Sequence, residues 1–318
     1  MEADITYRPT LEVAQPKGKP ASGRASADFT GPKPPVIHKR PRKRLIPGSR
    51  ALRRLCRVPR ILGHLLHGLA TIWFVFPWLE AHARRMRIRR WSRRLLHLLS
   101  VDIRMTGALA HPNVLVVANH VSWLDIFALH AVGPVRFIAK SEIARWPLLG
   151  SLVRGVGTLF IERHRRRDTH RVAREMAAAL AGGDIVAVFP EGTVTDGTRV
   201  LPFKGSLLQP IVDARGTIQP VAIRYRTPAG ERSAAAAYHD VAFLGSFWRI
   251  CGERALVVEL VATPPLAATG RHRRELAAEA EAAVRAALGL PGVATPPGGR
   301  SRRDDKDSDG NVCPRDRR

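Results

Sequence analysis

From about Val101 to Leu290, short apolar runs rich in β-branched residues alternate with longer segments whose apolar residues recur at helical spacing. This alternation is typical of an α/β sheet covered by helices. The pattern therefore predicts a mixed α/β domain over residues 100–290. The expected strands are Val101–Met105, Asn113–Ala118, Val135–Ala139, Thr158–Glu162, Asp184–Phe189, Ile218–Tyr225 and Leu256–Val261, and the expected helices are Ser122–His130, Asp168–Ala181 and Arg271–Leu288.

The most apolar stretch of the chain precedes this domain and runs from Ile61 to Trp78. Arginines flank it at both ends, whereas a spanning helix carries its positive charge mainly on one side. We therefore expect monotopic attachment or a single shallow insertion at the cytoplasmic face of the cell membrane, with the arginines on anionic headgroups. On a helix, the apolar side would comprise Ile61, Leu62, Leu65, Leu66, Leu69, Ile72, Trp73 and Phe76, and the opposite side His64, His67 and Thr71.

A second stripe follows in residues 84–99, where Ile88, Trp91, Leu95 and Leu98 recur at helical spacing among further arginines. Residues 51–99 are therefore predicted to form amphipathic helices that bind a phospholipid surface. The alternative is that both helices pack on the domain that follows. The membrane interpretation is preferred because a soluble domain rarely has so much arginine beside so much apolar surface.

The two ends of the chain differ in composition from the rest. Residues 1–50 are rich in proline and basic residues, and residues 291–318 mix Arg, Asp, Gly and Pro without periodicity, so both are predicted to be disordered tails. The 52 basic and 27 acidic residues give a formal net charge of +25. Such an excess indicates a polyanionic neighbour, which is nucleic acid, anionic lipid or a phosphorylated substrate.

Cysteine usage and the N-terminal sequence indicate the compartment. The three cysteines, Cys56, Cys251 and Cys313, are too few and too widely spaced to suggest a disulfide framework or a zinc site. No apolar run lies beside the N-terminus, so no signal peptide is expected. A reducing, cytoplasmic environment fits best.

Polar residues gather directly after several of the expected strands. His120 and Asp125 follow the strand Asn113–Ala118, Lys140 follows the next strand along the chain, and Glu191 follows Asp184–Phe189. In open α/β sheets, ligands bind at the edge where the strands end. The sequence therefore predicts a site at this edge.

His120 and Asp125 are five residues apart at a junction between strand and helix, so the histidine can turn back toward the carboxylate. Such a pair makes a general base, because the carboxylate holds one ring nitrogen and leaves the other to take a proton from a hydroxyl. Ser122 is expected to cap the helix. A nucleophilic role for Ser122 is rejected, because the chain contains no Gly-x-Ser-x-Gly elbow.

The sequence around this pair resembles the PlsC-like glycerolipid acyltransferase family, because four motifs occur in the family's order over residues 100–225. One departure is that Val194-Thr195 stands where the third motif often continues with Arg-Ser. The four motifs are Asn119-His120-Val121-Ser122-Trp123-Leu124-Asp125, Gly157-Thr158-Leu159-Phe160-Ile161-Glu162-Arg163, Phe189-Pro190-Glu191-Gly192-Thr193 and Gln219-Pro220-Val221-Ala222-Ile223.

The resemblance implies transfer of a fatty acyl group from acyl-CoA or acyl-ACP to the sn-2 hydroxyl of lysophosphatidate, which would give phosphatidate without a metal or another cofactor. An alternative acceptor is another lysolipid, such as lyso-ornithine lipid. His120 and Asp125 would be catalytic. The guanidinium of Arg163 suits a phosphate monoester, and Lys140 is a further candidate for phosphate contact.

The third motif has two possible roles. Glu191 and Gly192, with Thr193, could bind the glycerol hydroxyls of the acceptor or shape the site around it.

A different class of function is a basic protein that binds membrane or nucleic acid without catalysis. Nucleic-acid binding is not expected, because the chain shows neither basic strands interleaved with aromatics nor a recognition helix.

Overall fold

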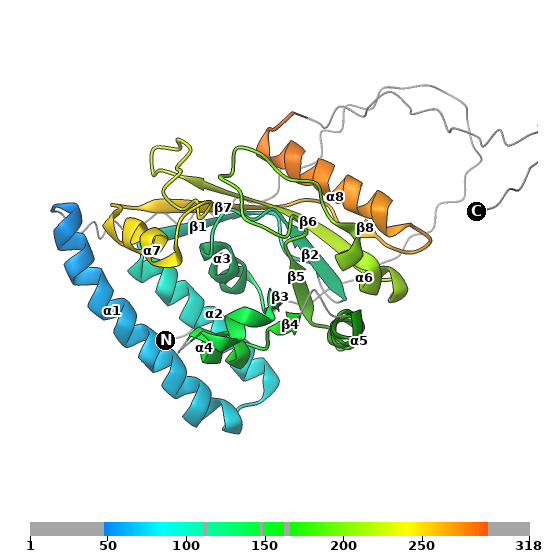
Figure 1. The fold of residues 1–318 in the computed structure, drawn as a ribbon, viewed down its shortest axis with the longest axis horizontal. Coiled ribbons are helices and arrows are strands. Elements are labelled where there is room, and N and C mark those ends of the chain that lie inside the picture. Colours follow the sequence, from blue (N-terminus) through cyan, green and yellow to red (C-terminus); the bar gives the residue numbers. More distant parts are fainter. Residues whose placement is uncertain (1–47, 111–112, 147–148, 162–165, 292–318) are drawn as a thin grey trace, which may run out of the picture. The chain divides into compact units, whose positions relative to one another are not determined.

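The computed structural model describes residues 48–110, 113–146, 149–161 and 166–291, which lie within the compact unit Pro35–Arg318. The predicted tails, residues 1–50 and 291–318, lie almost entirely outside the described residues, as does Cys313. Figure 1 shows a twisted sheet with helices on both of its faces and a pair of long helices at one side.

The described strands form one mixed sheet, in the order β1-β7-β6-β2-β5-β3-β4, with β8 paired to β6 beside this path. Strands β6, β2, β5, β3 and β4 are parallel to one another, whereas β7 runs antiparallel to β6 and parallel to β1. The strands are β1 (Val101–Thr106), β2 (Val114–Ala118), β3 (Val135–Lys140), β4 (Leu159–Ile161), β5 (Ile185–Val188), β6 (Thr217–Arg226), β7 (Leu256–Ala262) and β8 (Leu266–Ala267).

Two hydrophobic cores lie on opposite faces of this sheet. One joins α2, α3 and α7 to alternate strand residues such as Val116 and Ile223, and the other joins α5, α6 and α8 to their neighbours Val117 and Ala222. The helices that surround the sheet are α3 (Leu124–Val132), η3 (Ser141–Arg145), α4 (Leu149–Gly155), α5 (Arg166–Ala181), η4 (Gly205–Leu208), α6 (Gln209–Asp213), α7 (Phe243–Gly252) and α8 (Arg273–Leu288).

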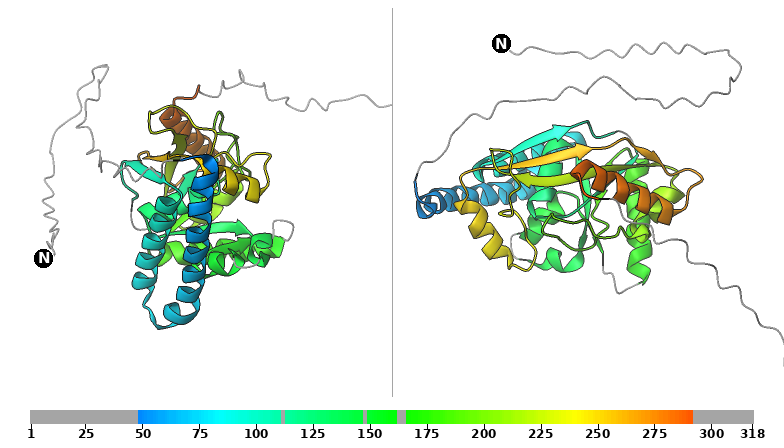
Figure 2. Two further views of the ribbon diagram at one scale, coloured as in Figure 1. Left: turned by 90° about the vertical axis from the view of Figure 1, so that its left-hand side faces the viewer. Right: turned by 90° about the horizontal axis from the view of Figure 1, so that it is seen from above.

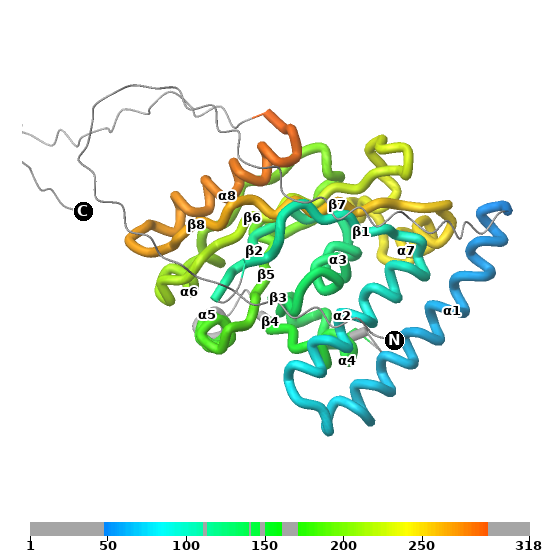
Figure 3. The backbone as a smooth tube through the Cα atoms, turned by 180° about the vertical axis from the view of Figure 1, so that it is seen from behind, coloured from blue at the N-terminus to red at the C-terminus, as the bar shows by residue number. Residues whose placement is uncertain are grey.

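Helix α1 (Arg50–Ala70) continues through the short helices η1 (Thr71–Val75) and η2 (Phe76–Trp78) and turns back into α2 (Ala81–Leu98). Figure 2 shows α1 and α2 side by side as a hairpin, and Figure 3 shows the same pair from behind. Helix α2 packs on α3, while α1 contacts α2, α7 and α4. The hairpin is therefore built onto the α/β domain.

Two arginines of α1 hold the hairpin to the end of α7. The side chains of Arg53 and Arg57 are buried within the protein, which corrects the expectation that they lie on lipid headgroups. The carbonyls at a helix C-terminus lack partners within the helix, so they are natural acceptors for guanidinium groups. Arg53 donates to the carbonyls of Gly252 and Gly48, and Arg57 to those of Cys251, Glu253 and Arg254 and to Ser100 Oγ.

Helix α2 is fixed by its arginines in the same way. Arg89 and Arg93 both donate to the carbonyl of Ala131 in the last turn of α3, at 3.3 and 2.7 Å. Arg85 pairs with Asp184, which also accepts from Arg136 on β3. These arginines therefore stabilise the fold through contacts within the chain.

The apolar stripes of the hairpin face the protein more than the sequence predicted. Trp91, Leu95 and Leu98 of α2 pack into the core of the domain, which is the alternative that the sequence left open. His64, expected on a polar side, stacks on the Trp91 ring with centroids 4.6 Å apart. Helix α1 has apolar residues on two sides: Ile61 is buried, whereas its neighbour Leu62 is exposed.

Each strand and helix predicted within the α/β domain is present, with its ends within one or two residues of the prediction. The first helix of the hairpin differs, because α1 begins at Arg50, well before the predicted start at Ile61. The sequence did not predict α4, α6, α7 and β8, which are short or lack a regular apolar period. Cys251 is fully buried in the core. The mixed α/β architecture is confirmed.

Candidate active site

The site is built at the ends of parallel strands. Strand β2 is buried along its whole length, and the chain turns from its end through Asn119 and His120 into α3. Because β5, β3 and β4 run parallel to β2, their following loops meet at the same edge. This edge joins the first and third motifs, as the sequence predicted.

His120 and Asp125 form the expected pair. Nδ1 of His120 lies 2.8 Å from Oδ2 of Asp125, whose side chain is fully buried in the first turn of α3. The same oxygen accepts the backbone N–H groups of Val121 and Ser122, at 2.8 and 2.9 Å. With the carboxylate as acceptor, Nδ1 carries the proton and Nε2 has the free electron pair. Such a pair can act as a general base.

Tyr225 is a partner of this pair that the sequence analysis missed. Its hydroxyl lies at the end of β6 and donates to Oδ1 of Asp125 at 2.6 Å. Burial raises the pKa of Tyr225 well above its usual value, and the Asp125 carboxylate raises it further. The hydroxyl therefore remains a neutral donor, and both carboxylate oxygens of Asp125 are hydrogen-bonded.

The ring of His120 is also held from the side. It stacks on the ring of Phe189, with centroids 4.0 Å apart and planes within 10°. Phe189 in turn stacks on Phe137 of β3, at 5.9 Å. The imidazole is therefore fixed in orientation by a carboxylate on one nitrogen and by an aromatic face.

Glu191 binds the main chain of the first motif. Its side chain is buried, and Oε1 accepts the backbone N–H of His120 at 2.8 Å while Oε2 accepts that of Leu201 at 2.9 Å. Burial raises the pKa of Glu191 to about 7, against the opposing effect of these two hydrogen bonds. Of the two roles that the sequence left open, this geometry favours shaping the site over contact with glycerol hydroxyls.

The rest of the third motif lies beside His120. Gly192 has a φ of +74°, a left-handed conformation that favours glycine. Gly192 and Thr193 both line the cavity that His120 reaches, and so does Val194. Thr195, which departs from the family pattern, donates its backbone N–H to the carbonyl of His120 at 2.8 Å. Glu191 and Thr195 thus fix both sides of the His120 main chain.

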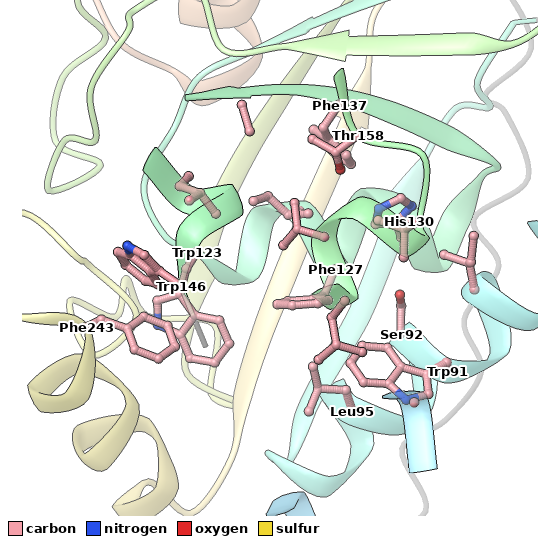
Figure 4. A pocket seen from close by; sticks show the side chains of 18 of the residues that line it. Trp91, Ser92, Leu95, Trp123, Phe127, His130, Phe137, Trp146, Thr158 and Phe243 are labelled. Carbon is pink, nitrogen blue, oxygen red and sulfur yellow. The ribbon is translucent and has the colours of Figure 1, made fainter. Parts of the chain in front are cut away.

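A cavity of about 660 Å³ is lined by His120 and extends between the domain and the α1–α2 hairpin. Figure 4 shows part of its wall, where aromatic side chains such as Trp91, Phe127, Phe137 and Phe243 lie among aliphatic ones. Ile61, Leu65 and Ile72 contribute the wall on the side of the hairpin. Its size and apolar lining suit a long hydrocarbon chain.

This chain is similar to known acyltransferases. The acyltransferase family model matches residues 101–224. A 1-acyl-sn-glycerol-3-phosphate acyltransferase of Neisseria meningitidis is 39% identical over 211 residues, which are 66% of this chain and 81% of that protein. A lyso-ornithine lipid O-acyltransferase of Pseudomonas aeruginosa is 37% identical over 253 residues, 77% of this chain and 96% of that protein.

The chain belongs to the acyltransferase family. The fold of this acyltransferase is similar to the crystal structure of PlsC, the 1-acyl-sn-glycerophosphate acyltransferase of Thermotoga maritima. That comparison has a TM-score of 0.55 and 24% sequence identity, and it covers 76% of this chain and 97% of that chain. The predicted mixed α/β fold and the resemblance to glycerolipid acyltransferases are thereby confirmed.

Two predicted substrate contacts of this acyltransferase fall on parts that the structure leaves undescribed. Arg163 lies in residues 162–165, outside the described residues. The backbone of Lys140 ends β3 beside Ile161 of β4, but its side chain is not among those described. Both remain predictions for phosphate contact.

Two further polar residues of the motifs have structural contacts. Asn119 is buried, and its amide exchanges two hydrogen bonds with the backbone of Ile223 on β6. Gln219 accepts from the backbone N–H of Ala110 and donates to the carbonyls of Ala108 and Thr263. The first and fourth motifs are therefore joined by the pairing of β2 with β6.

Proposed function

We propose that this acyltransferase moves a fatty acyl group from a thioester to the free hydroxyl of lysophosphatidate, with His120 and Asp125 as the catalytic pair. One observation carries the proposal. The imidazole whose Nδ1 is held by Asp125 lines an apolar cavity large enough for a hydrocarbon chain. The acyl donor is acyl-CoA or acyl-ACP.

In this mechanism, Nε2 of His120 takes the proton from the acceptor hydroxyl as its oxygen attacks the thioester carbonyl. The tetrahedral intermediate then collapses, the carbon–sulfur bond breaks, and the departing thiol sulfur receives the proton from the imidazolium. Asp125 stabilises the positive charge on the ring between these steps. The products are the new oxygen ester and the free thiol.

An acyl-enzyme on Ser122 is not part of the proposal. The Ser122 side chain is fully buried, and Oγ accepts the backbone N–H of Leu124 at 3.3 Å. The sequence predicted Ser122 as the cap of α3, but the N-cap position is Trp123, and Ser122 lies one residue before it. Direct transfer between the two substrates needs only the base.

The membrane surface is proposed to contact an exposed apolar face along the hairpin and α7. Within the described part of the chain, the segment Arg50–Trp78 is long and apolar enough to cross a membrane. Its start is fastened to α7 by Arg53 and Arg57, and Ile72 near its end packs against Gly155 of α4. Attachment at both ends to one domain favours monotopic binding. The exposed apolar residues are Leu52, Leu55, Leu62, Leu66, Trp73, Phe74, Trp78, Trp146, Leu244 and Trp248.

A purified-enzyme assay tests the proposed reaction by crossing acyl-CoA and acyl-ACP with several lysolipids. We expect transfer to lysophosphatidate, with turnover lowered about 10²- to 10⁴-fold in His120→Ala, as is usual on loss of a general base. Circular dichroism would verify that the variant is folded. Turnover near that of the wild type in a folded His120→Ala variant would refute the mechanism.

Lyso-ornithine lipid is the second candidate acceptor. The Pseudomonas relative with that printed activity aligns over 96% of its length, against 81% for the Neisseria relative. The same assay separates the two, because only lysophosphatidate has a phosphate monoester for Arg163 to bind. If lysophosphatidate were the acceptor, Arg163→Ala would raise its KM and leave that for lyso-ornithine lipid almost unchanged.

A further inference from the structure

Two buried polar side chains interrupt the apolar wall of the cavity. His130, in the last turn of α3, is 3% exposed, and Ser92, on α2, is 1% exposed. Both line the cavity, and Figure 4 shows them on its wall near Phe127. Neither ring nitrogen of His130 nor Oγ of Ser92 has a hydrogen-bond partner among the described residues.

This arrangement is costly unless a ligand completes it. A buried polar group without a partner destabilises a protein, so the great majority of such groups are hydrogen-bonded. The His130 ring packs on the Phe137 ring in a T-shaped arrangement, with centroids 5.0 Å apart and planes at 69°. An apolar side chain could make the same contact. Packing alone therefore does not explain an imidazole here, and it does not explain a hydroxyl on the neighbouring helix.

The chemistry of the two groups defines their ligand. Burial lowers the pKa of His130 to about 4, so its ring is neutral and has one donor and one acceptor nitrogen. The Ser92 hydroxyl can also donate or accept. A neutral oxygen function such as a hydroxyl matches this set, whereas a carboxylate or phosphate would bring an unpaired charge into an apolar cavity.

The position of His130 sets where that oxygen lies along a chain. His130 is five residues beyond Asp125 on α3, which is about 7.5 Å along the helix axis. A carbon–carbon bond is about 1.5 Å long, so an extended chain that runs alongside α3 from His120 covers this rise in about five or six bonds. The oxygen would therefore be in the middle of the chain.

We propose that His130 and Ser92 form a polar subsite for a hydroxyl in the middle of an acyl chain bound in this cavity. The proposal rests on the acyl-transfer function given above, and it names the substrate class of that same site. The chain belongs either to the thioester donor or to the lysolipid acceptor. Either source presents the same chemistry to the subsite.

The test compares acyl thioesters of equal length that carry no hydroxyl, a hydroxyl on the third carbon, or a hydroxyl in the middle of the chain. A second arm uses an unsubstituted donor with acceptors whose chain is or is not hydroxylated. In the arm whose chain occupies the cavity, we expect kcat/KM to favour the mid-chain hydroxyl on the order of 10-fold, as one net hydrogen bond provides. No such preference is expected for the hydroxyl on the third carbon.

Variants connect this preference to the two residues. His130→Leu should abolish it without loss of stability, because it removes a buried polar group that has no hydrogen-bond partner in the part of the chain that the structure describes. His130→Gln, which keeps a donor and an acceptor, should retain part of it, and Ser92→Ala should reduce it. Leu95→Met changes the apolar lining alone and is expected to leave the preference as in the wild type.

Two results would overturn the inference. One is an equal kcat/KM for hydroxylated and unsubstituted chains in the wild type, which would mean that a trapped water satisfies both groups. The other is an unchanged preference in folded His130→Leu. Failure of the proposed function looks different, because no donor would then acylate any lysolipid.

Discussion

Replacing Tyr225 by Phe removes one hydroxyl from beneath the catalytic pair and leaves the rest of the site in place. The hydroxyl is buried and donates at 2.6 Å to a carboxylate that has no exposed surface. A hydrogen bond to a charged group contributes about 1.5–3 kcal/mol, so Tyr225→Phe should lower the free energy of unfolding by that amount. For a domain of this size, the melting temperature should fall by about 3–12 °C.

The same change should slow the reaction without weakening substrate binding. Oδ2 of Asp125 keeps its contacts with His120 Nδ1 and with two backbone N–H groups, so we expect kcat to fall only about 10-fold, the equivalent of one hydrogen bond. KM should stay constant, because Tyr225 is not part of the cavity wall. Thermal unfolding and steady-state kinetics measure the two effects.

Tyr238→Phe is the matched control. Tyr238 lines the cavity and its ring packs on Phe243, so loss of its hydroxyl should leave the melting temperature and kcat nearly unchanged. If Tyr225→Phe lowered the melting temperature while kcat stayed at the wild-type value, Tyr225 would have a structural role only. If neither quantity changed, the hydrogen bond would contribute nothing and the reasoning would be wrong.

Three further predictions follow from buried or exposed side chains. Glu191→Gln should destabilise the protein by about 1–3 kcal/mol, because its amide faces a backbone donor. Burial raises the pKa of Glu191 to about 7, against 4.5 for a free carboxyl, so the folded state binds a proton that the unfolded state has already lost. The free energy of unfolding, measured in urea, should therefore fall by up to about 3 kcal/mol as the pH rises from about 5 to about 8. Glu191→Gln should lack this pH dependence. Arg57→Met should lower the free energy of unfolding by about 3 kcal/mol or more, because four buried or partly buried acceptors lose their donor. Arg60 is exposed, so Arg60→Met should change the free energy of unfolding little. Urea unfolding of both variants at one pH measures the difference. Trp73→Ser with Phe74→Ser should weaken flotation with lipid vesicles while the melting temperature stays constant, and equal flotation would contradict the proposed membrane face.

The sequence predicted the catalytic pair because its geometry is local. His120 and Asp125 lie in one turn, where the start of α3 directs the carboxylate back toward the histidine and two backbone N–H groups. Tyr225 lies 100 residues away and meets Asp125 only because β6 pairs with β2. A signal did exist, since Tyr225 follows Val221 and Ile223 at a period of two on the buried face of a strand. A tyrosine in that position usually has a polar partner.

The arginines of the hairpin could not be assigned from the sequence. Their partners are backbone carbonyls at the ends of α7 and α3, and a carbonyl is the same in every residue. A sequence with arginines beside apolar residues looks the same whether the guanidinium groups bind lipid phosphates or the carbonyls at helix ends. Only the fold, which brings Gly252 to Arg53 and Ala131 to Arg93, distinguishes the two.

The hairpin has two functions in one structure, and this decides how membrane binding can be tested. Leu95 and Leu96 belong to the core of the α/β domain, and Ile61 and Leu65 line the cavity together with His120. Deleting residues 1–98 would therefore open the core and the cavity together, and loss of membrane retention would only report unfolding. Substitutions confined to the exposed side of the same helices separate the two effects. If the exposed side lies in lipid, a hydrocarbon chain passes from the bilayer to His120 along walls made by the very helices that bind the membrane.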